Sequence, residues 1–180
     1  MTTPAVFLDR DGTVIEDTHY VGALDDVVPI PGAAEALARL AEAGFALFVV
    51  TNQSGVAREY FSMSEVDAIH EHLARAWEAE GAQVTHFFVC PHHPDDGCAC
   101  RKPSPKFLID ASKRYDVDLE RSFMVGDSPA DIGCGIAAGT RTVLVRTGKG
   151  ADTENDPSVR ADSVQDDFSA AADWILACSN

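Results

Sequence analysis

The chain has 180 residues, a typical single-domain length, and we expect one domain over residues 1–180 that folds without disulfide bonds. Its formal net charge of −15 argues against nucleic acid or an anionic membrane surface as a partner. The N-terminal segment has neither a basic stretch nor a long apolar run, so we expect a cytoplasmic protein.

Apolar runs of strand length alternate with helical patterns, and this order predicts a doubly wound, mainly parallel α/β sheet of the Rossmannoid type. Strands are expected at residues 5–9, 46–52, 85–90, 122–127 and 142–145. Helices are expected at residues 32–44, 64–81, 104–116 and near 168–177, with Ser64 as the N-cap of the second. Residues 147–162 are polar and are expected to form a loop.

Acidic residues follow two of the predicted strands, where ligands bind in sheets of this kind. Asp9 and Asp11 follow the first strand, and Asp127 follows the fourth, with Asp131 one helical turn later. An isolated Asp-x-Asp is most often only a turn, but acidic groups at two strand ends favour a shared site. Such an oxygen-rich pocket suits Mg²⁺ together with a phosphate group.

Two further strand ends carry groups that can balance the charge of a phosphoryl group. Thr51 follows the second strand and offers a hydroxyl, and Lys102 follows the third and offers an ammonium group. An aspartate in the same crevice can act as a nucleophile and form an aspartyl-phosphate. The pattern therefore predicts phosphoryl-transfer chemistry.

The loop before Lys102 predicts a second metal site. Cys90, His92, Cys98 and Cys100 offer three thiolates and one imidazole within eleven positions, a set that suits tetrahedral structural Zn²⁺. All four positions of that metal would be filled, so its role would be to hold the loop and the adjacent cations rather than to catalyse. The loop has no C-x-x-C pair at a helix start, which argues against a redox function.

The motifs "FLDRDGT", "VVTN", "RKP" and "VGDSPAD" occur in this order over residues 5–147, and the chain resembles the haloacid dehalogenase superfamily. The resemblance implies that Asp9 is the nucleophile and that Asp11 is the general acid and later the base. It also implies that Mg²⁺ binds the Asp9 carboxylate, the Asp11 carbonyl and Asp127. Thr51 and Lys102 would then steady the phosphoryl group, with Asp131 in support.

Within the superfamily, the zinc loop resembles two phosphatase families, which act on D-glycero-D-manno-heptose 1,7-bisphosphate at the 7-phosphate and on histidinol phosphate. The runs "DTHYV" and "TNQSGVARE" are similar to the heptose family, which supplies heptose 1-phosphate for nucleotide-activated heptose synthesis. This likeness implies substrate contacts at Asp17, His19, Tyr20, Asn52, Gln53, Ser54 and Arg101. Ser128 departs from the family pattern, in which lysine often follows the aspartate of the fourth motif.

Charge gives a separate argument for the bisphosphate. Arg58 and Arg101 are placed to meet a second anionic group, whereas the amine of histidinol phosphate would need an acidic partner. A solvated loop arginine and a packing tyrosine remain the alternative interpretations of Arg58 and Tyr20. Histidinol-phosphate phosphatase is the second hypothesis, and a zinc-knuckle binding module is a remote third.

The site should be open, because no large cap domain is visible in the sequence. Three short inserts, at residues 17–24, 53–62 and 90–103, would have to select the substrate. We expect a small phosphorylated sugar as the substrate. We also expect a monomer, since no apolar stripe is left without an assigned partner.

Overall fold

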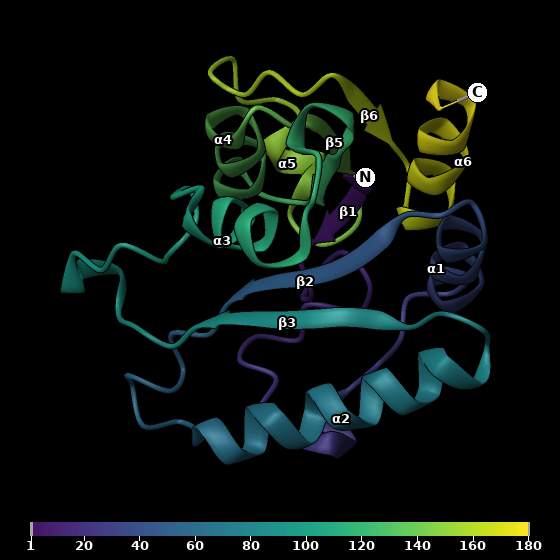
Figure 1. Cartoon of the computed structure of the whole chain (residues 1–180). Coiled ribbons are helices and arrows are strands. Elements are labelled where there is room, and N and C mark those ends of the chain that lie inside the picture. The colour runs from purple at the N-terminus through teal and green to yellow at the C-terminus, as the bar shows by residue number, and fades with distance from the viewer. Residues whose placement is uncertain (1, 180) are drawn as a thin grey trace.

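The structure is a computed structural model that describes residues 2–179, and it contains one six-stranded parallel sheet (Figure 1). The strands are β1 (Ala5–Leu8), β2 (Ala46–Asn52), β3 (Val84–Cys90), β4 (Phe123–Gly126), β5 (Arg141–Val145) and β6 (Ser163–Gln165). Their spatial order is β3-β2-β1-β4-β5-β6. The chain therefore builds outward from β1 in one direction and then returns to place β4 on its other side.

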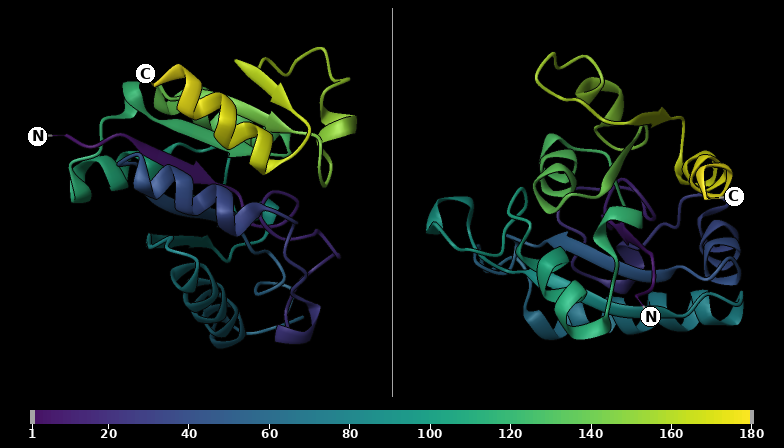
Figure 2. Two further views of the ribbon diagram at one scale, coloured as in Figure 1. Left: turned by 90° about the vertical axis from the view of Figure 1, so that its right-hand side faces the viewer. Right: turned by 45° about the horizontal axis from the view of Figure 1, so that its top comes forward.

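Helices cover both faces of the sheet. They are α1 (Ala33–Glu42), α2 (Met63–Ala79), α3 (Lys106–Tyr115), α4 (Pro129–Ala138), α5 (Gly150–Thr153) and α6 (Phe168–Cys178). Three short 3₁₀ turns, η1 (Leu24–Asp26), η2 (Pro94–Asp96) and η3 (Leu119–Arg121), lie in connections. Helices α1 and α6 run side by side on one face, as Figure 2 shows, and α2 shares that face.

The alternation of side chains along β1 separates two hydrophobic cores. Val6 and Leu8 pack into the core with α1, α2 and α6, whereas Ala5 and Phe7 pack into the core with α3 and α4. Both β1 faces are fully buried, which explains why this strand reads as a continuous apolar run rather than an alternating one. The predicted fold class is confirmed.

The sequence-based elements differ from the structure in several places, and one is α5, which lies within residues 147–162 that were expected to form a loop. Helix α4 was not among the expected helices. The N-cap of α2 is Ser62 and not Ser64, because Ser62 and Glu65 form a reciprocal capping box in which Ser62 N donates to the Glu65 carboxylate over 2.7 Å. Strand β6 was also not predicted, since three residues of mixed polarity carry no strand pattern.

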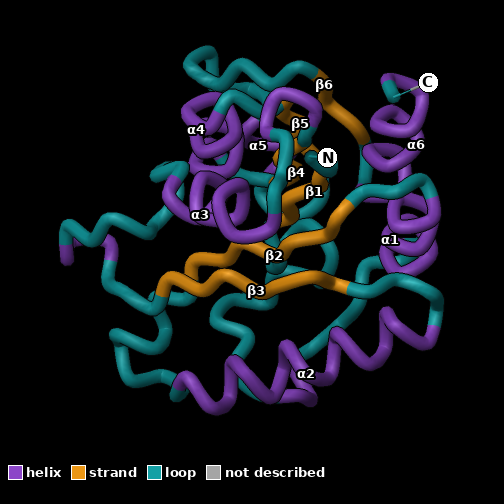
Figure 3. The backbone as a smooth tube through the Cα atoms, viewed as in Figure 1, coloured by secondary structure: helices purple, strands orange, loops and turns teal. Residues whose placement is uncertain are grey.

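The connections after the first three strands are loops with no more than one 3₁₀ turn each (Figure 3). They correspond to the three expected inserts, and in residues 2–179 they contain no large cap domain. None of the helices in these residues is both long and apolar enough to cross a membrane. The site at this end of the sheet is consequently bordered by these loops and by the start of α4.

Candidate active site

Three carboxylates meet where the strand order reverses, between β1 and β4. Asp9 directly follows β1, Asp127 directly follows β4, and Asp131 lies in the first turn of α4. One carboxylate oxygen from each lies within 4.8 Å of the others. Neighbouring parallel strands end at the same edge of the sheet, and the crevice at a reversal of strand order is the usual ligand site of such folds.

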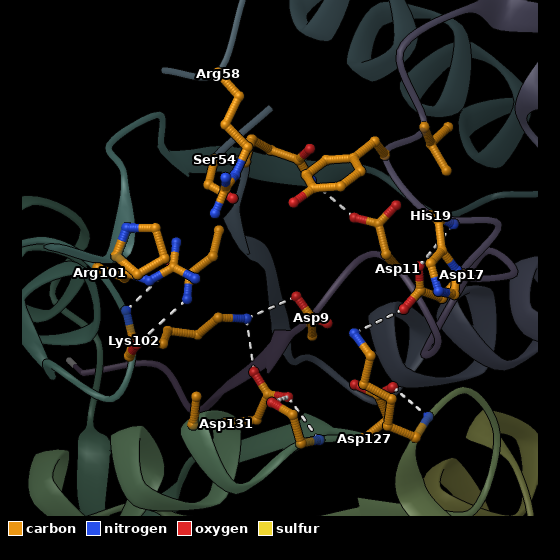
Figure 4. A pocket seen from close by; sticks show the side chains of 18 residues that line it. Asp9, Asp11, Asp17, His19, Ser54, Arg58, Arg101, Lys102, Asp127 and Asp131 are labelled. Carbon is orange, nitrogen blue, oxygen red and sulfur yellow. Dashed lines mark hydrogen bonds and ion pairs between the residues drawn. The ribbon is translucent and has the colours of Figure 1, made fainter. Parts of the chain in front are cut away.

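Lys102 reaches this cluster of three carboxylates from the loop after β3 (Figure 4). Its ammonium nitrogen lies 2.6 Å from an oxygen of Asp9, 2.6 Å from an oxygen of Asp131 and 2.6 Å from the Val50 carbonyl oxygen. The Asn52 amide fixes the backbone of Lys102 by accepting from its N–H and donating to its carbonyl oxygen. Although burial favours the neutral amine, Asp131 and Asp9 raise the pKa of Lys102 above its usual value.

Asp131 holds both Lys102 and the start of α4 in place. One oxygen pairs with Lys102, and the other accepts from the backbone N–H and the hydroxyl group of Ser128, the latter over 2.6 Å. Because both oxygens have partners, Asp131 is a poor candidate for direct metal binding. Ser128 is thus the N-cap of α4 and also lines the cavity.

The charges around Asp9 require a further cation. Three buried carboxylates lie around the Lys102 ammonium group, and without a metal burial raises the pKa of Asp9 to about 8 in spite of Lys102. Burial also raises the pKa of Asp127 to about 6, against the opposing N–H of Lys149. A divalent cation bound by Asp9 and Asp127 would offset this excess negative charge, and hard oxygen donors are the set that Mg²⁺ prefers.

A loop after β5 holds Asp127 in place. The Lys149 N–H donates to Asp127 over 2.8 Å, and the Thr147 hydroxyl donates to the Gly12 carbonyl oxygen over 2.6 Å. Gly12 and Gly148 both have positive φ, and a Cβ on either would lie 2.3 or 2.2 Å from the Asp127 carboxylate. The two glycines therefore leave the space that this carboxylate occupies.

The side chain of Lys149 forms an ion pair of 2.9 Å with Asp17, so this loop also contacts the insert after β1. Burial would raise the pKa of Asp17, but the bond from Lys149 lowers it below its usual value. Sequence reasoning assigned residues 147–162 only to a loop and missed Lys149. The signal was present, because residues 147–150 follow a predicted strand just as Asp9 and Asp127 do.

Asp11 lies beside the carboxylate cluster and is held by two side chains. The Gln53 amide donates to Asp11 over 2.8 Å and to the Thr51 hydroxyl over 2.7 Å. Arg10, which is fully buried, donates two hydrogen bonds of 3.0 Å to the same carboxylate. Arg10 was not among the predicted site residues.

These side chains surround a cavity of about 450 Å³ (Figure 4). All eight predicted substrate contacts line it, whereas Thr51 is buried beside the cavity and is not part of its lining. The eight are Asp17, His19, Tyr20, Asn52, Gln53, Ser54, Arg58 and Arg101. Tyr20 is exposed at the rim, where its ring packs edge-on against Tyr60 with centroids 4.9 Å apart.

Arg58 and Arg101 lie on the Lys102 side of the cavity, across from Asp17 and His19 (Figure 4). Arg58 Nε and Arg101 Nη1 are shielded from solvent and have no hydrogen-bond partner among the residues the structure describes. Both guanidinium groups line the cavity, where a ligand would need several acceptor atoms to satisfy their donors. An anion with several oxygens fits this requirement.

The four predicted zinc ligands converge at one point. Cys100 Sγ lies 3.2 Å from Cys90 Sγ and 3.8 Å from Cys98 Sγ, and His92 Nδ1 lies 3.3 Å from Cys100 Sγ. Zinc–sulfur bonds of about 2.3 Å in a tetrahedron would place sulfur atoms about 3.8 Å apart, so the set fits Zn²⁺. His93 instead accepts from the Asp95 N–H at the start of η2.

This cluster joins the end of β3 to the residues just before Lys102. Cys90 is the last residue of β3, and Cys100 lies two positions before Lys102. The loop between them packs little apolar surface, since residues 94–97 are all exposed. A bound Zn²⁺ would thus fix the path of the chain into the active site.

Comparison with known proteins agrees with this geometry. A family model for haloacid dehalogenase-like hydrolases matches residues 6–69, and a second model, described as HAD-hydrolase-like, matches residues 99–171. The D-glycero-β-D-manno-heptose-1,7-bisphosphate 7-phosphatase of Pseudomonas aeruginosa is 40% identical over 98% of this chain and 99% of its own length. The enzyme of the same name from Bordetella bronchiseptica is 41% identical over 95% of this chain and 97% of its own.

A crystal structure of the D,D-heptose 1,7-bisphosphate phosphatase from B. bronchiseptica, complexed with magnesium and phosphate, superposes with a TM-score of 0.92. It is 40% identical, and the match covers 97% of this chain and 98% of that one.

Mg²⁺ is expected to raise the melting temperature, and more so at about pH 8 than at about pH 5. Without Mg²⁺ the raised pKa values of Asp9 and Asp127 mean that stability is full below about pH 4 and is lost as the pH rises through about 6 and 8. At a Mg²⁺ concentration about 100 times its Kd the gain is about 2.7 kcal/mol, or roughly 5–10 °C. The gain is measured as the shift in melting temperature that Mg²⁺ causes in zinc-loaded protein at each pH.

Asp127→Asn is the control for this experiment and should lose most of the Mg²⁺-dependent gain. An equal gain at both pH values would contradict the assignment of the metal to these carboxylates.

Replacement of one zinc ligand is expected to release the metal and to impair the active site without unfolding the two cores. Cys98→Ser should lower bound zinc from one atom per chain towards zero. It should also reduce kcat/KM by roughly ten- to a hundredfold, because a shift of about 1 Å in a positioning group can cost that much. Metal analysis and circular dichroism check both parts.

Cys178→Ser is the matched control, since Cys178 lies in α6 outside the cluster and should leave zinc and activity unchanged. A Cys98→Ser protein with full zinc content or full activity would contradict the proposed role of the loop.

Proposed function

The chain belongs to the haloacid dehalogenase-like hydrolases, and we propose that it is a Mg²⁺-dependent phosphatase that removes the 7-phosphate of D-glycero-β-D-manno-heptose 1,7-bisphosphate. The product, heptose 1-phosphate, would enter the synthesis of nucleotide-activated heptose. The observation that carries the proposal is the buried cluster of Asp9, Asp127, Asp131 and Lys102, which faces a cavity lined by Arg58 and Arg101. The first part performs phosphoryl transfer, and the second accepts the other phosphate.

Asp9 is the proposed nucleophile. Its carboxylate directly follows β1 and is held by the Lys102 ammonium group at 2.6 Å. Attack of an Asp9 oxygen on the 7-phosphate forms an aspartyl-phosphate while the bond to the sugar oxygen breaks. Asp11 gives a proton to that leaving oxygen and later removes one from the water that hydrolyses the intermediate.

The charge on the transferred group is met by cations already in place. Lys102 can contact a phosphoryl oxygen without moving far, since it already bridges Asp9 and Asp131. The Thr51 hydroxyl accepts from Gln53, which leaves its own proton available for a phosphoryl oxygen. Mg²⁺, bound by the Asp9 carboxylate, the Asp11 carbonyl oxygen and Asp127, would neutralise negative charge that develops on the phosphoryl group.

The 1-phosphate is proposed to bind Arg58 and Arg101. The two side chains lie on one side of the cavity (Figure 4), and guanidinium groups bind phosphate oxygens in matched pairs. The sugar hydroxyl groups would contact the remaining lining residues, which are Asp17, His19, Tyr20, Asn52, Gln53 and Ser54. The open cavity suits such a compact polar substrate.

Histidinol phosphate is the second candidate, and the ion pair between Lys149 and Asp17 weighs against it. A cationic amine needs a free carboxylate, but Asp17 is engaged by Lys149 at 2.9 Å. The other carboxylates of the cavity serve the reacting centre. A zinc-knuckle binding module would not need the buried carboxylates, and it would leave the relation to the hydrolases unexplained.

We further propose that residues 1–180 act as a single domain and as a monomer in the cytoplasm, without a nucleic-acid or membrane partner. A net charge of −15 supports the last point, and the free cysteines Cys90, Cys98 and Cys100 suit a reducing compartment.

The substrate is tested by phosphate release in Mg²⁺ from both anomers of heptose 1,7-bisphosphate and from histidinol phosphate. The β-anomer is expected to exceed histidinol phosphate by a hundredfold or more in kcat/KM, about 2.7 kcal/mol of transition-state discrimination. Asp9→Asn should be inactive with intact folding. A preference for histidinol phosphate would contradict the assignment of Arg58 and Arg101, and an active Asp9→Asn protein would contradict the mechanism.

The arginine site is tested by removing the residue and the substrate group together. Arg58→Ala and Arg101→Ala should each lower kcat/KM for the 1,7-bisphosphate by roughly 10–150-fold, the equivalent of about 1.5–3 kcal/mol for a hydrogen bond to a charged group. With heptose 7-phosphate, which lacks the second phosphate, the loss should be within about threefold. Arg75→Ala, on the exposed face of α2, is the control.

Equal losses with both substrates would show that the arginines act on the reacting phosphate or on the fold, and not on the 1-phosphate.

A further inference from the structure

Arg10 occupies an unusual position for a cation. It stands between the two aspartates of the first motif and is fully buried, although it carries a permanent charge. Burial of an unpaired guanidinium group is strongly unfavourable, so its partners must compensate. Its Nε and Nη2 atoms each donate to the Asp11 carboxylate over 3.0 Å, one to each oxygen.

The remaining donors of Arg10 tie it to two other parts of the chain. Nη1 lies 3.3 Å from His70 Nε2 on α2, and Nη2 lies 3.4 Å from the Val21 carbonyl oxygen in the insert after β1. A guanidinium nitrogen can only donate, so His70 Nε2 accepts and the ring proton resides on Nδ1. Burial, with a contribution from Arg10, lowers the pKa of His70 to about 3, which keeps the ring neutral near pH 7.

His70 is itself held rigidly. Its ring stacks on Phe87 of β3, with ring centroids 4.5 Å apart and an interplanar angle of 18°. Helix α2 and strand β3 therefore fix the imidazole, the imidazole fixes the guanidinium group, and the guanidinium group fixes Asp11. The chain of contacts runs from the hydrophobic core to the cavity.

The hydrogen bonds distinguish the two oxygens of Asp11. Oδ2 accepts from both Arg10 and Gln53, which fills its two lone pairs. Among residues 2–179, Oδ1 accepts from Arg10 alone, which leaves one position free. Asp11 lines the cavity with a side chain that is 20% exposed. Oδ1 is thus the atom that remains for a proton transfer.

We propose that Arg10 is a positioning residue that acts through Asp11, and that His70 in turn positions Arg10. Together with Gln53, Arg10 reserves Oδ1 of Asp11 for the leaving oxygen in the first half-reaction and for water in the second. The proposal rests on the phosphatase function and assigns to Arg10 and His70 a role in the proton-transfer steps.

The leaving group provides a test that a purely structural role would not pass. A sugar alkoxide needs a proton from Asp11, whereas p-nitrophenolate leaves without one. Arg10→Met should lower kcat for the heptose bisphosphate about a hundredfold, with KM changed less than about threefold, since general acid–base catalysis is worth at least about that much. With p-nitrophenyl phosphate the first step should remain within about threefold of wild type.

The second step still needs Asp11 as a base, so the Arg10→Met protein should release a burst of one p-nitrophenolate per active site, followed by slow turnover. Rapid-mixing absorbance measures both phases. Equal losses in the phosphorylation step with both substrates would overturn the proposal, and so would wild-type kinetics.

Two variants of His70 test the same inference where Arg10→Met does not fold. His70→Gln keeps an acceptor near the position of Nε2 and should stay within about threefold of wild type, whereas His70→Leu should lower kcat for the sugar substrate with KM retained. His72→Leu, on the exposed side of the same helix, is the control. Equal kcat values for His70→Gln and His70→Leu would overturn the proposal, whereas an active Asp9→Asn protein would overturn the phosphatase function instead.

Discussion

The active site depends on one buried ammonium group. Lys102 Nζ contacts two carboxylates and a backbone carbonyl oxygen, all at 2.6 Å, and the residue is only 4% exposed. This charge offsets part of the repulsion between the Asp9 and Asp131 carboxylates at such close range. Asn52 and the zinc loop position the backbone of Lys102, and Asp131 forms an ion pair with its side chain. Much of the site can therefore be understood as support for one cation.

The fold explains why these groups meet although they are far apart in the chain. β1 lies in the middle of the sheet, so the residues that follow it have neighbours from β2 on one side and from β4 on the other. The loop after the edge strand β3 must reach back across β2 to deliver Lys102. A mobile loop would lose much of its conformational freedom on doing so, and a metal clamp near its end reduces that cost in the folded protein.

The sequence predicted the fold class and the principal acidic groups, because strand ends in parallel sheets converge and short apolar runs mark those ends. It did not predict Arg10, since an arginine between two aspartates is equally compatible with an exposed turn, and its buried contacts with His70 depend on the packing of α2. Lys149 could have been found, because it also follows a strand. The error in the N-cap of α2 arose because Ser62 and Ser64 are both followed by an acidic residue three positions later. In the structure the Glu65 carboxylate accepts from Ser62 N, which makes Ser62 the N-cap.

Gly12 and Gly148 have a consequence for the evolution of this protein. Each faces the Asp127 carboxylate so closely that a methyl group would displace it, and each has a backbone conformation that other residues rarely adopt. A mutation at one glycine cannot be compensated at the other, because both would crowd the same atoms. Two positions far apart in the sequence are therefore held to glycine by the volume of one carboxylate, and we expect sequence changes in the loops around the cavity to leave both glycines in place.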